Sequence, residues 1–233
     1  MKSLAGTTSI VTGGAGGLGT VVSRRLLEEG SSVWIFGRSP DIESRISPDP
    51  RGAMQYLQVD VTNEKHVEHA FHTVMNRSLR IDLVVNAVGG YLPGKPICDV
   101  SEAEWDSMMN VNLKSSFLCT REAARRMKST GGGRIVNISA LASMRPSLNR
   151  APYSISKSGV NLLTELAAQE LKGSGISVFA IAPSIIVTDA NVKSMPNDDQ
   201  RGWVKPEEIS DLIVFLCSGH GANLSGTVFK MGG

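Results

Sequence analysis

The chain has few cysteines and no cysteine and histidine pattern typical of a metal site. Its 233 residues include three cysteines, Cys98, Cys119 and Cys217, which are widely spaced and form no Cys-x-x-Cys pair. An odd, scattered set of this kind predicts free thiols in a reducing compartment, and neither disulfides nor zinc ligands. His66 and His69 share a predicted helix face, but the sequence offers no third ligand near them. We expect no metal site.

An excess of one charge and a long apolar run are both missing. The formal net charge is +2, from 24 lysines and arginines against 22 aspartates and glutamates, and these residues are scattered. Nothing therefore indicates a surface for nucleic acid or membrane. No segment approaches the ~18 apolar residues of a membrane span, and residues 1–6 lack the apolar region of a signal peptide. We expect a soluble cytoplasmic protein.

Internal repeats and low-complexity linkers are also missing, which favours a single domain over residues 1–233. A chain of this length can bury one sizeable core. The predicted strands are 8–11, 32–36, 55–59, 83–86, 134–138, 177–182 and 227–230. The predicted helices are 21–29, 64–75, 102–128, 153–171 and 206–217. This alternation predicts an α/β fold, a doubly wound, Rossmann-like parallel sheet of about seven strands in three α/β/α layers, with ligands beyond the carboxyl ends of the strands.

A glycine cluster follows the first predicted strand, in the run Thr12-Gly13-Gly14-Ala15-Gly16-Gly17-Leu18-Gly19. Strand, glycine turn and helix in this order form the context that a phosphate-binding loop requires. Glycine permits positive φ angles and close backbone approach, and the helix N-terminus offers N–H groups and a partial positive charge to pyrophosphate. The motif predicts a dinucleotide site; a flexible turn is the plain alternative.

The end of the second strand indicates which dinucleotide binds. An NAD site places Asp or Glu there, about 20 residues after the loop, to hold the ribose hydroxyls. This chain has Gly37 and Arg38 instead. A guanidinium can form charge-assisted, bidentate hydrogen bonds with a 2′-phosphate, which no carboxylate repels here. We therefore expect NADP(H), with a solvated turn arginine as the alternative.

Tyr153 and Lys157 are spaced so that they share one helix face. A phenol titrates near pH ~10, and a nearby cation lowers its pKa by stabilising the phenolate. Such a tyrosine can protonate a carbonyl oxygen during reduction or deprotonate an alcohol during oxidation. An isolated pair of this spacing is usually an ordinary surface pair. The glycine loop in the same chain makes a hydride-transfer enzyme the better interpretation.

Together these features resemble the short-chain dehydrogenase/reductase family, from the first residue to the last. Asp60-Val61 resembles the adenine-contacting pair, Asn86-Ala87-Val88-Gly89 stands in place of Asn-Asn-Ala-Gly, and Asn112 matches an asparagine that extends a proton relay through water. The segment 183–188 resembles the turn that holds the nicotinamide carboxamide. The resemblance implies that the dinucleotide contacts Gly13, Gly16, Gly17, Leu18, Gly19, Arg38, Asp60, Val61, Asn86, Gly89, Lys157, Pro183, Ile186 and Thr188.

One departure from the family pattern concerns the reaction itself. Counting back from Tyr153, the catalytic serine should stand at position 140, where the sequence has Ala140. One oriented donor of this kind is worth roughly 2.7–4 kcal/mol in the transition state. Three explanations remain open: Ser139 or Ser143 substitutes from a shifted backbone, the substrate brings its own polarising group, or the chemistry is lost. A dihydropteridine-reductase-like branch of the family also works with the tyrosine and lysine but no serine.

We therefore expect an NADP(H)-dependent oxidoreductase of the carbonyl or quinonoid reductase type. Tyr153 is its predicted acid or base, assisted by Lys157 and Asn112, with Ser139 as the candidate hydroxyl donor. The alternative, motivated by Ala140, is a catalytically silent NADP(H)-binding sensor or scaffold.

Two further expectations concern the surroundings of the site. A 3-oxoacyl thioester is the second choice of substrate, and its acyl carrier would need a basic patch, for which the only dense cluster is Arg121, Arg125 and Arg126. The stretch 184–204 is predicted to form a lid that shapes the substrate pocket, or a surface loop that packs against a neighbouring subunit. The family resemblance implies that helices 102–128 and 153–171 form a subunit interface, so a homodimer or homotetramer is expected.

Overall fold

The computed structural model describes residues 2–40, 52–145, 147–219 and 221–232. Seven strands form one parallel sheet in the order β3-β2-β1-β4-β5-β6-β7. They are β1 (Thr8–Thr12), β2 (Ser32–Gly37), β3 (Met54–Gln58), β4 (Leu83–Asn86), β5 (Gly133–Ile138), β6 (Ile176–Pro183) and β7 (Val228–Met231). The predicted doubly wound sheet is confirmed, and every predicted strand boundary lies within one residue of the observed one.

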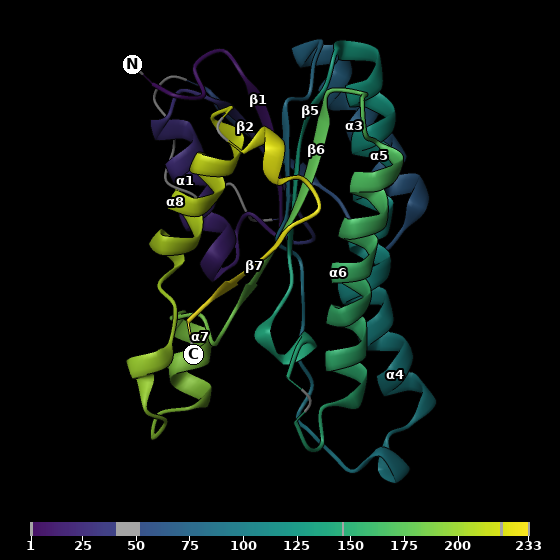
Figure 1. Ribbon diagram of the computed structural model, residues 1–233, viewed down its shortest axis with the longest axis vertical. Coiled ribbons are helices and arrows are strands. Elements are labelled where there is room, and N and C mark those ends of the chain that lie inside the picture. Colours follow the sequence, from purple (N-terminus) through teal and green to yellow (C-terminus); the bar gives the residue numbers. More distant parts are fainter. Residues whose placement is uncertain (1, 41–51, 146, 220, 233) are drawn as a thin grey trace.

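Helices cover both faces of the sheet (Figure 1). On one face lie α1 (Gly17–Glu28) and α8 (Pro206–Cys217). On the other lie α3 (Glu64–Ser78), α5 (Ser115–Thr130) and α6 (Ala151–Glu170). Two separate apolar clusters fill the spaces between the sheet and these helices. Because both faces are covered, β1, β4 and β6 are buried along their whole length, as is usual for parallel strands.

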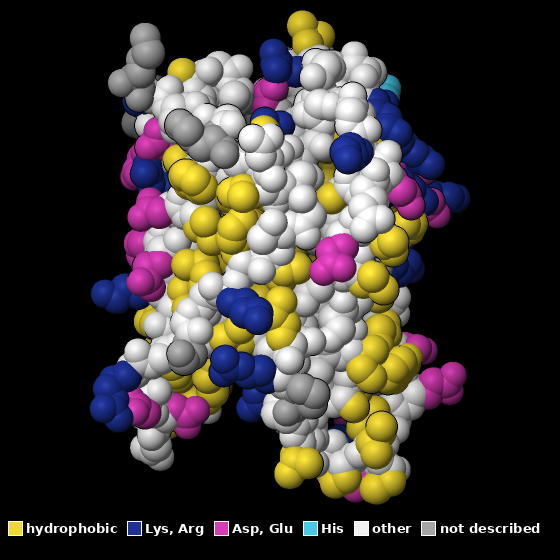
Figure 2. All heavy atoms as spheres, in the orientation of Figure 1, with side chains coloured by type: hydrophobic (Ala, Val, Ile, Leu, Met, Phe, Trp, Pro, Cys, Tyr) yellow, Lys and Arg dark blue, Asp and Glu magenta, His cyan; other side chains and the backbone are white. Residues whose placement is uncertain are grey.

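The order of the sheet reverses between β1 and β4, and the strand ends on either side gather the predicted site. Thr12 pairs with Asn86, and Asn86 pairs with Asn137. The residues that follow these strands therefore meet at one edge, where such sheets bind ligands. In Figure 2 a hollow at the lower end of the molecule marks this edge, between the part that contains α7 (Asp189–Ser194) and the part that contains α4 (Glu102–Met108).

The predicted helix over 102–128 is confirmed as helical, but its middle has π-helical geometry that the sequence did not predict. It is divided into α4, a π-helical segment Met109–Lys114 (η2) and α5. Widening to π geometry leaves backbone carbonyls that normal helical amides no longer reach. Two side-chain hydroxyls form hydrogen bonds to these carbonyls: Ser115 Oγ donates to Val111 O at 2.6 Å, and Ser116 Oγ donates to Asn112 O at 2.8 Å. The wide turn carries Asn112 into the core.

The stretch 184–204 is more ordered than the sequence suggested. It contains α7 and a short 3₁₀ helix, Gln200–Gly202, and Ile186 forms a parallel bridge with Val204. The Thr188 side chain caps α7 by accepting the Asn191 amide at 3.3 Å, a contact that favours helix initiation. The segment is therefore a folded flap at the edge of the sheet.

Several large apolar side chains are exposed on α4, α5 and α6: Trp105, Phe117, Ile155, Leu162 and Leu166. Figure 2 shows apolar side chains along the side of the molecule where α4 and α6 lie. Among the helices in the described parts of the chain, none is both long and apolar enough to cross a membrane.

Candidate functional site

The glycine loop packs so closely that side chains cannot replace its Cα hydrogens. Gly13 has a φ of +67°, a region that favours glycine, and its carbonyl accepts the Gly16 amide at 2.9 Å. A Cβ on Gly19 would overlap the Gly13 carbonyl, and one on Gly17 would lie 2.7 Å from Cγ2 of Thr188. The loop thus offers a ligand direct access to its backbone, and Thr188 from the distant flap borders the same space.

Helix α1 begins at this loop without competing negative charge. Gly16 stands at the N-cap with no side chain, the first turn contains no acidic residue, and Leu18 packs into the core. Free N–H groups and the partial positive charge of a helix N-terminus suit a diphosphate. The loop and the helix start therefore fit the pyrophosphate of a dinucleotide.

The turn after β2 is held in place by side chains of β3. The Tyr56 hydroxyl lies 2.6 Å from the carbonyl oxygens of both Gly37 and Ser39, and Gln58 donates to the Arg38 carbonyl at 3.0 Å. The backbone of Arg38 is thereby fixed, while its side chain is exposed. A cation at this place, with no carboxylate on the strand end, fits a dinucleotide that carries a 2′-phosphate.

Asp60 lies close to this turn. Burial raises the pKa of its carboxyl, but hydrogen bonds from the Thr62 hydroxyl and amide, and the charges of Arg38 and His66, outweigh that effect, so the pKa lies below its ordinary value. The carboxyl is therefore ionised at neutral pH. The Val61 side chain is buried in the core, which leaves its backbone to border a ligand.

Asn86 belongs to a buried polar network. Its Nδ2 donates to Asn137 Oδ1 at 2.8 Å and to Thr120 Oγ1 at 3.2 Å, while Asn137 Nδ2 donates to Thr164 Oγ1 at 2.9 Å. The network ties the ends of β4 and β5 to α5 and α6. The Asn86 side chain thus fixes the strand end from which Gly89 follows, and a contact between Asn86 and the dinucleotide stays a prediction.

Lys157 is joined to the end of β5 by two reciprocal hydrogen bonds. Its ammonium donates to the Ile138 carbonyl at 2.8 Å, and its own carbonyl accepts the Ser139 hydroxyl at 3.1 Å. The residue is only 5% exposed, and burial lowers its pKa to about 8. A Cβ on Gly89 would lie 3.1 Å from Nζ. The ammonium therefore reaches the loop after β4, where it fits the ribose hydroxyls of a dinucleotide.

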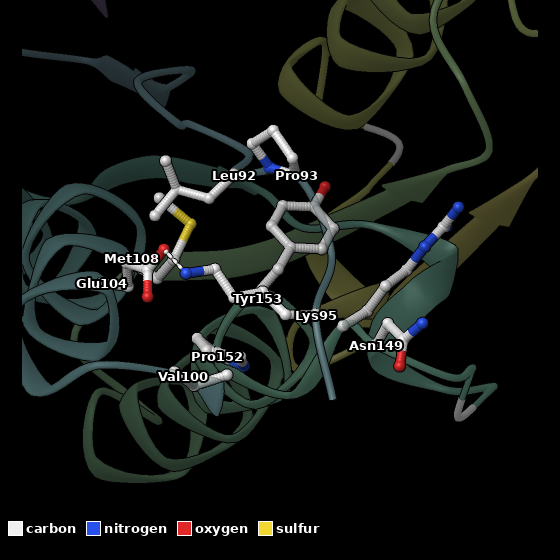
Figure 3. Close-up of a pocket in the computed structure, with 10 residues that line it drawn as sticks. Leu92, Pro93, Lys95, Val100, Glu104, Met108, Asn149, Pro152 and Tyr153 are labelled. Carbon is white, nitrogen blue, oxygen red and sulfur yellow. Dashed lines mark ion pairs between the residues drawn. The ribbon is translucent and has the colours of Figure 1, made fainter. Parts of the chain in front are cut away.

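Tyr153 lies one helical turn before Lys157 and lines a small cleft (Figure 3). Its ring meets that of Tyr91 edge to face, with centroids 5.1 Å apart. Burial raises the pKa of the Tyr153 phenol; the charge of Arg150 opposes this rise, and Tyr91 adds to it. The expectation that Lys157 lowers this pKa is therefore wrong for this structure, because burial outweighs the opposing charge of Arg150 and Lys157 contributes no resolved shift.

Asn112 connects the loop after β4 to α6. Its Oδ1 accepts the Gly90 amide at 2.9 Å, and its Nδ2 donates to the Gly90 carbonyl at 3.1 Å and to Ser156 Oγ at 3.0 Å. The side chain is fully buried. The structure gives Asn112 a positioning role, and its role in a proton relay stays a prediction.

Ser139 and Ser143, the two candidate replacements for the serine expected at position 140, both hydrogen-bond to backbone carbonyls. The buried Ser139 hydroxyl donates to the Lys157 carbonyl. The Ser143 hydroxyl donates to the Ala140 carbonyl at 2.6 Å and accepts Asn161 Nδ2 at 2.8 Å. Both serines thus direct their protons to backbone carbonyls. A role of Ser139 as donor to the substrate stays a prediction, and it would require the hydroxyl to leave the Lys157 carbonyl.

The turn that follows β6 completes this edge of the sheet. Pro183 is buried, and the Ile186 carbonyl accepts Asn191 Nδ2 at 2.9 Å. Because Thr188 contacts Gly17, the turn lies beside the glycine loop. One ligand can therefore touch both segments. Within the flap, the side chains of Val192, Met195 and Trp203 are all half-buried.

Sequence reasoning missed two residues that lie against Tyr153. The guanidinium carbon of Arg150 lies 5.8 Å from the centroid of the Tyr91 ring, and that ring contacts Tyr153. Neither residue belongs to a spaced motif. They meet because the loop after β4 touches the loop before α6, where a Cβ on Gly94 would overlap the carbonyl of Asn149.

Metal ligands do not gather in the parts of the chain that the structure describes. No group of three His, Cys, Asp or Glu side chains there is placed to hold a metal ion. His220 lies outside the described residues.

The buried ammonium of Lys157 predicts a particular dependence of stability on pH. Its pKa is about 8 in the folded chain, against an ordinary value of 10.5, so between these values the unfolded chain binds more protons. The free energy of unfolding of the wild type should therefore rise by up to a few kcal/mol from pH 8 to pH 10.5, relative to a Lys157→Met variant. Urea unfolding of both proteins measures this; a difference that does not change with pH would contradict it.

Comparison with known proteins agrees with this geometry. The family model for short chain dehydrogenase matches residues 7–199. A short-chain type dehydrogenase/reductase from Picea abies is 32% identical over 253 residues, which cover 99% of this chain and 92% of that protein. A cyclopentanol dehydrogenase from a Comamonas species is 31% identical over 237 residues, covering 96% and 94%. The structure of a short-chain type dehydrogenase/reductase from Mycobacterium ulcerans matches with a TM-score of 0.91 at 29% identity, covering 97% of this chain and 88% of that one. The chain belongs to the short-chain dehydrogenase family.

Proposed function

We propose that this protein is an NADP(H)-dependent reductase of carbonyl or quinonoid compounds, with Tyr153 as the proton donor. The observation that carries the proposal is the placement of Tyr153 in a cleft one turn before Lys157, whose ammonium reaches Gly89. The glycine loop and Thr188 lie at the same edge of the sheet. The similarity to a protein named cyclopentanol dehydrogenase supports a reaction between an alcohol and a ketone.

The raised pKa of Tyr153 favours reduction at neutral pH. A reduced nicotinamide, held by the glycine loop and Lys157, would supply a hydride to the carbonyl carbon, and the carbonyl oxygen, which gains the C=O π electrons, would then take a proton. The Tyr153 phenol keeps its proton at neutral pH because burial raises its pKa, so it can act as the acid in this step. Lys157, whose pKa is about 8, is mostly cationic below that pH, and its ammonium, which reaches Gly89, would hold the ribose hydroxyls of the dinucleotide.

Replacing Tyr153 by Phe tests the proton transfer. The variant keeps the ring but loses the proton, so kcat for NADPH-dependent reduction should fall roughly 10²- to 10⁴-fold, while NADPH binding changes little. Stopped-flow turnover and NADPH fluorescence measure the two effects. Wild-type turnover by Tyr153→Phe would overturn the assignment.

The silent-sensor alternative is tested with the wild-type protein alone. Because Tyr153, Lys157 and Asn112 are all in place, we favour turnover. Tight NADPH binding without NADPH consumption across ketones, quinones and dihydropterin-type compounds would favour the sensor instead.

The preference for NADP(H) rests on Arg38. Replacing it by Asp removes a charge-assisted hydrogen bond to the 2′-phosphate and adds repulsion, so KM for NADPH should rise roughly 10- to 100-fold, while KM for NADH should fall or stay constant. Steady-state kinetics with both cofactors decide this. Equal changes in KM for NADPH and NADH would show that Arg38 does not bind the 2′-phosphate.

Reduction of a 3-oxoacyl thioester on a carrier protein is less favoured by the structure. Arg121 pairs with Glu64 at 2.6 Å, and Arg125 pairs with Glu122 at 2.6 Å. Arg126 also approaches Glu122, at 3.5 Å. The basic cluster that a carrier would need is therefore largely neutralised by its own surroundings.

We further propose a homodimer or homotetramer formed through the exposed apolar residues of α4, α5 and α6. Burying such side chains stabilises association. Sedimentation of the protein at micromolar concentration should show a dimer or tetramer, and a stable monomer would contradict this.

The proposed compartment is the cytoplasm. Cys98, Cys119 and Cys217 are all free thiols in the structure, which is usual in reducing compartments. Recovery of the protein in an exported fraction would contradict the proposal.

A further inference from the structure

The cleft beside Tyr153 contains one charge that has no opposite charge within it. Ten residues line this cleft (Figure 3): Leu92, Pro93, Lys95, Val100, Glu104, Met108, Asn149, Arg150, Pro152 and Tyr153. Three of them are charged at neutral pH. Lys95 and Glu104 form an ion pair at 2.6 Å, which neutralises both. The guanidinium of Arg150 remains as the net charge of the cleft.

Arg150 is held against aromatic rings. Its guanidinium carbon lies 5.8 Å from the centroid of Tyr91, whose ring meets Tyr153 edge to face at 5.1 Å. Within the described parts of the chain, no carboxylate lies within ion-pair distance of Arg150. An arginine over an aromatic face keeps its charge and its planar donor fork available to a ligand.

The position of Arg150 is not explained by helix stability. It stands at the N-cap of α6, makes no side-chain capping hydrogen bond, and is followed by a first turn without acidic residues. A cation is electrostatically unfavourable at this end of a helix. Asn149, just before it, has a φ of +63°, an uncommon backbone conformation for a residue other than glycine. The Asn149 carbonyl is packed against Gly94, which holds the start of α6 in place.

We propose that Arg150 binds a carboxylate of the substrate, so that the preferred substrates are short oxo acids, reduced to hydroxy acids. A single guanidinium matches a single negative charge through two parallel hydrogen bonds. Because Arg150 and Tyr153 flank the same Tyr91 ring, the carboxylate and the reacting carbonyl are separated by only a few bonds. This inference rests on the proposed reduction at Tyr153.

The same arrangement bears on the missing hydroxyl at position 140. A substrate anchored by its carboxylate presents its carbonyl to Tyr153 in a fixed orientation, and such positioning supplies part of the acceleration. Arg150 then acts as a specificity-determining residue that offsets the absence of a donor at Ala140.

The test compares oxo acids with their neutral esters. The probes are 2-, 3- and 4-oxopentanoate and the methyl ester of each, reduced with NADPH by the wild type and by Arg150→Met. The wild type should prefer at least one acid over its ester. Arg150→Met should raise KM for that acid roughly 10- to 100-fold more than KM for the ester. The KM of Arg150→Lys for that acid should lie between the values of the wild type and of Arg150→Met. No preference for any acid, or equal effects on acid and ester, would overturn the proposal.

Arg145→Met is the matched control. Arg145 is an exposed arginine of the same loop and does not line the cleft, so its variant should retain the wild-type preference for acids. A loss of preference equal to that of Arg150→Met would show a general charge effect and overturn the site.

A binding measurement separates this proposal from the proposed function. Calorimetry with pentanoate and the NADP-loaded protein should show binding to the wild type that weakens at least tenfold in Arg150→Met. If no carbonyl compound is reduced but pentanoate binding depends on Arg150, the proposed function fails and the carboxylate site stands. If pentanoate binds both proteins equally or neither, the site fails.

Discussion

The rest of the site depends on the reciprocal pair of hydrogen bonds between the end of β5 and α6. The Lys157 ammonium donates to the Ile138 carbonyl, and the Ser139 hydroxyl donates to the Lys157 carbonyl. Together they fix both the rotation and the height of α6 against the sheet. Because Tyr153 precedes Lys157 by one turn, its position beside the cleft follows from this contact. The buried network around Asn86 and Asn137 fixes the neighbouring strand ends in the same way.

This anchoring has an electrostatic consequence. A lysine that satisfies a buried carbonyl sits in a poorly solvated place, and its pKa falls to about 8. The same burial raises the pKa of Tyr153. The two pKa values are thus shifted apart, that of the phenol above its ordinary value and that of the ammonium below. A Tyr153 phenol that retains its proton and a Lys157 ammonium that loses its proton easily suit the reduction of a carbonyl at neutral pH.

Most of the fold could be predicted from the sequence, because each parallel strand is an apolar run and each loop carries its own signal. The glycine loop, Tyr153 and Lys157 were predictable because each has a recognisable local spacing and because they occur together in one chain. The π-helical turn at Asn112 was not, because it arises from contacts with Gly90 and Ser156, which are distant in sequence. Desolvation of Tyr153 and the meeting of Tyr91 with Arg150 also depend on which loops touch, and no local pattern encodes that.

Under the proposed function, the glycine loop, the Lys157 anchor and the arginine beside Tyr91 together hold a reactive carbonyl between a hydride donor and Tyr153. The most direct test of this account is a crystal structure with NADPH bound. The account predicts that the nicotinamide ring lies beside Lys157 and faces the Tyr153 hydroxyl, with space for a carbonyl oxygen about 3 Å from that hydroxyl. A ring bound elsewhere, or a Tyr153 side chain turned away from it, would contradict the account.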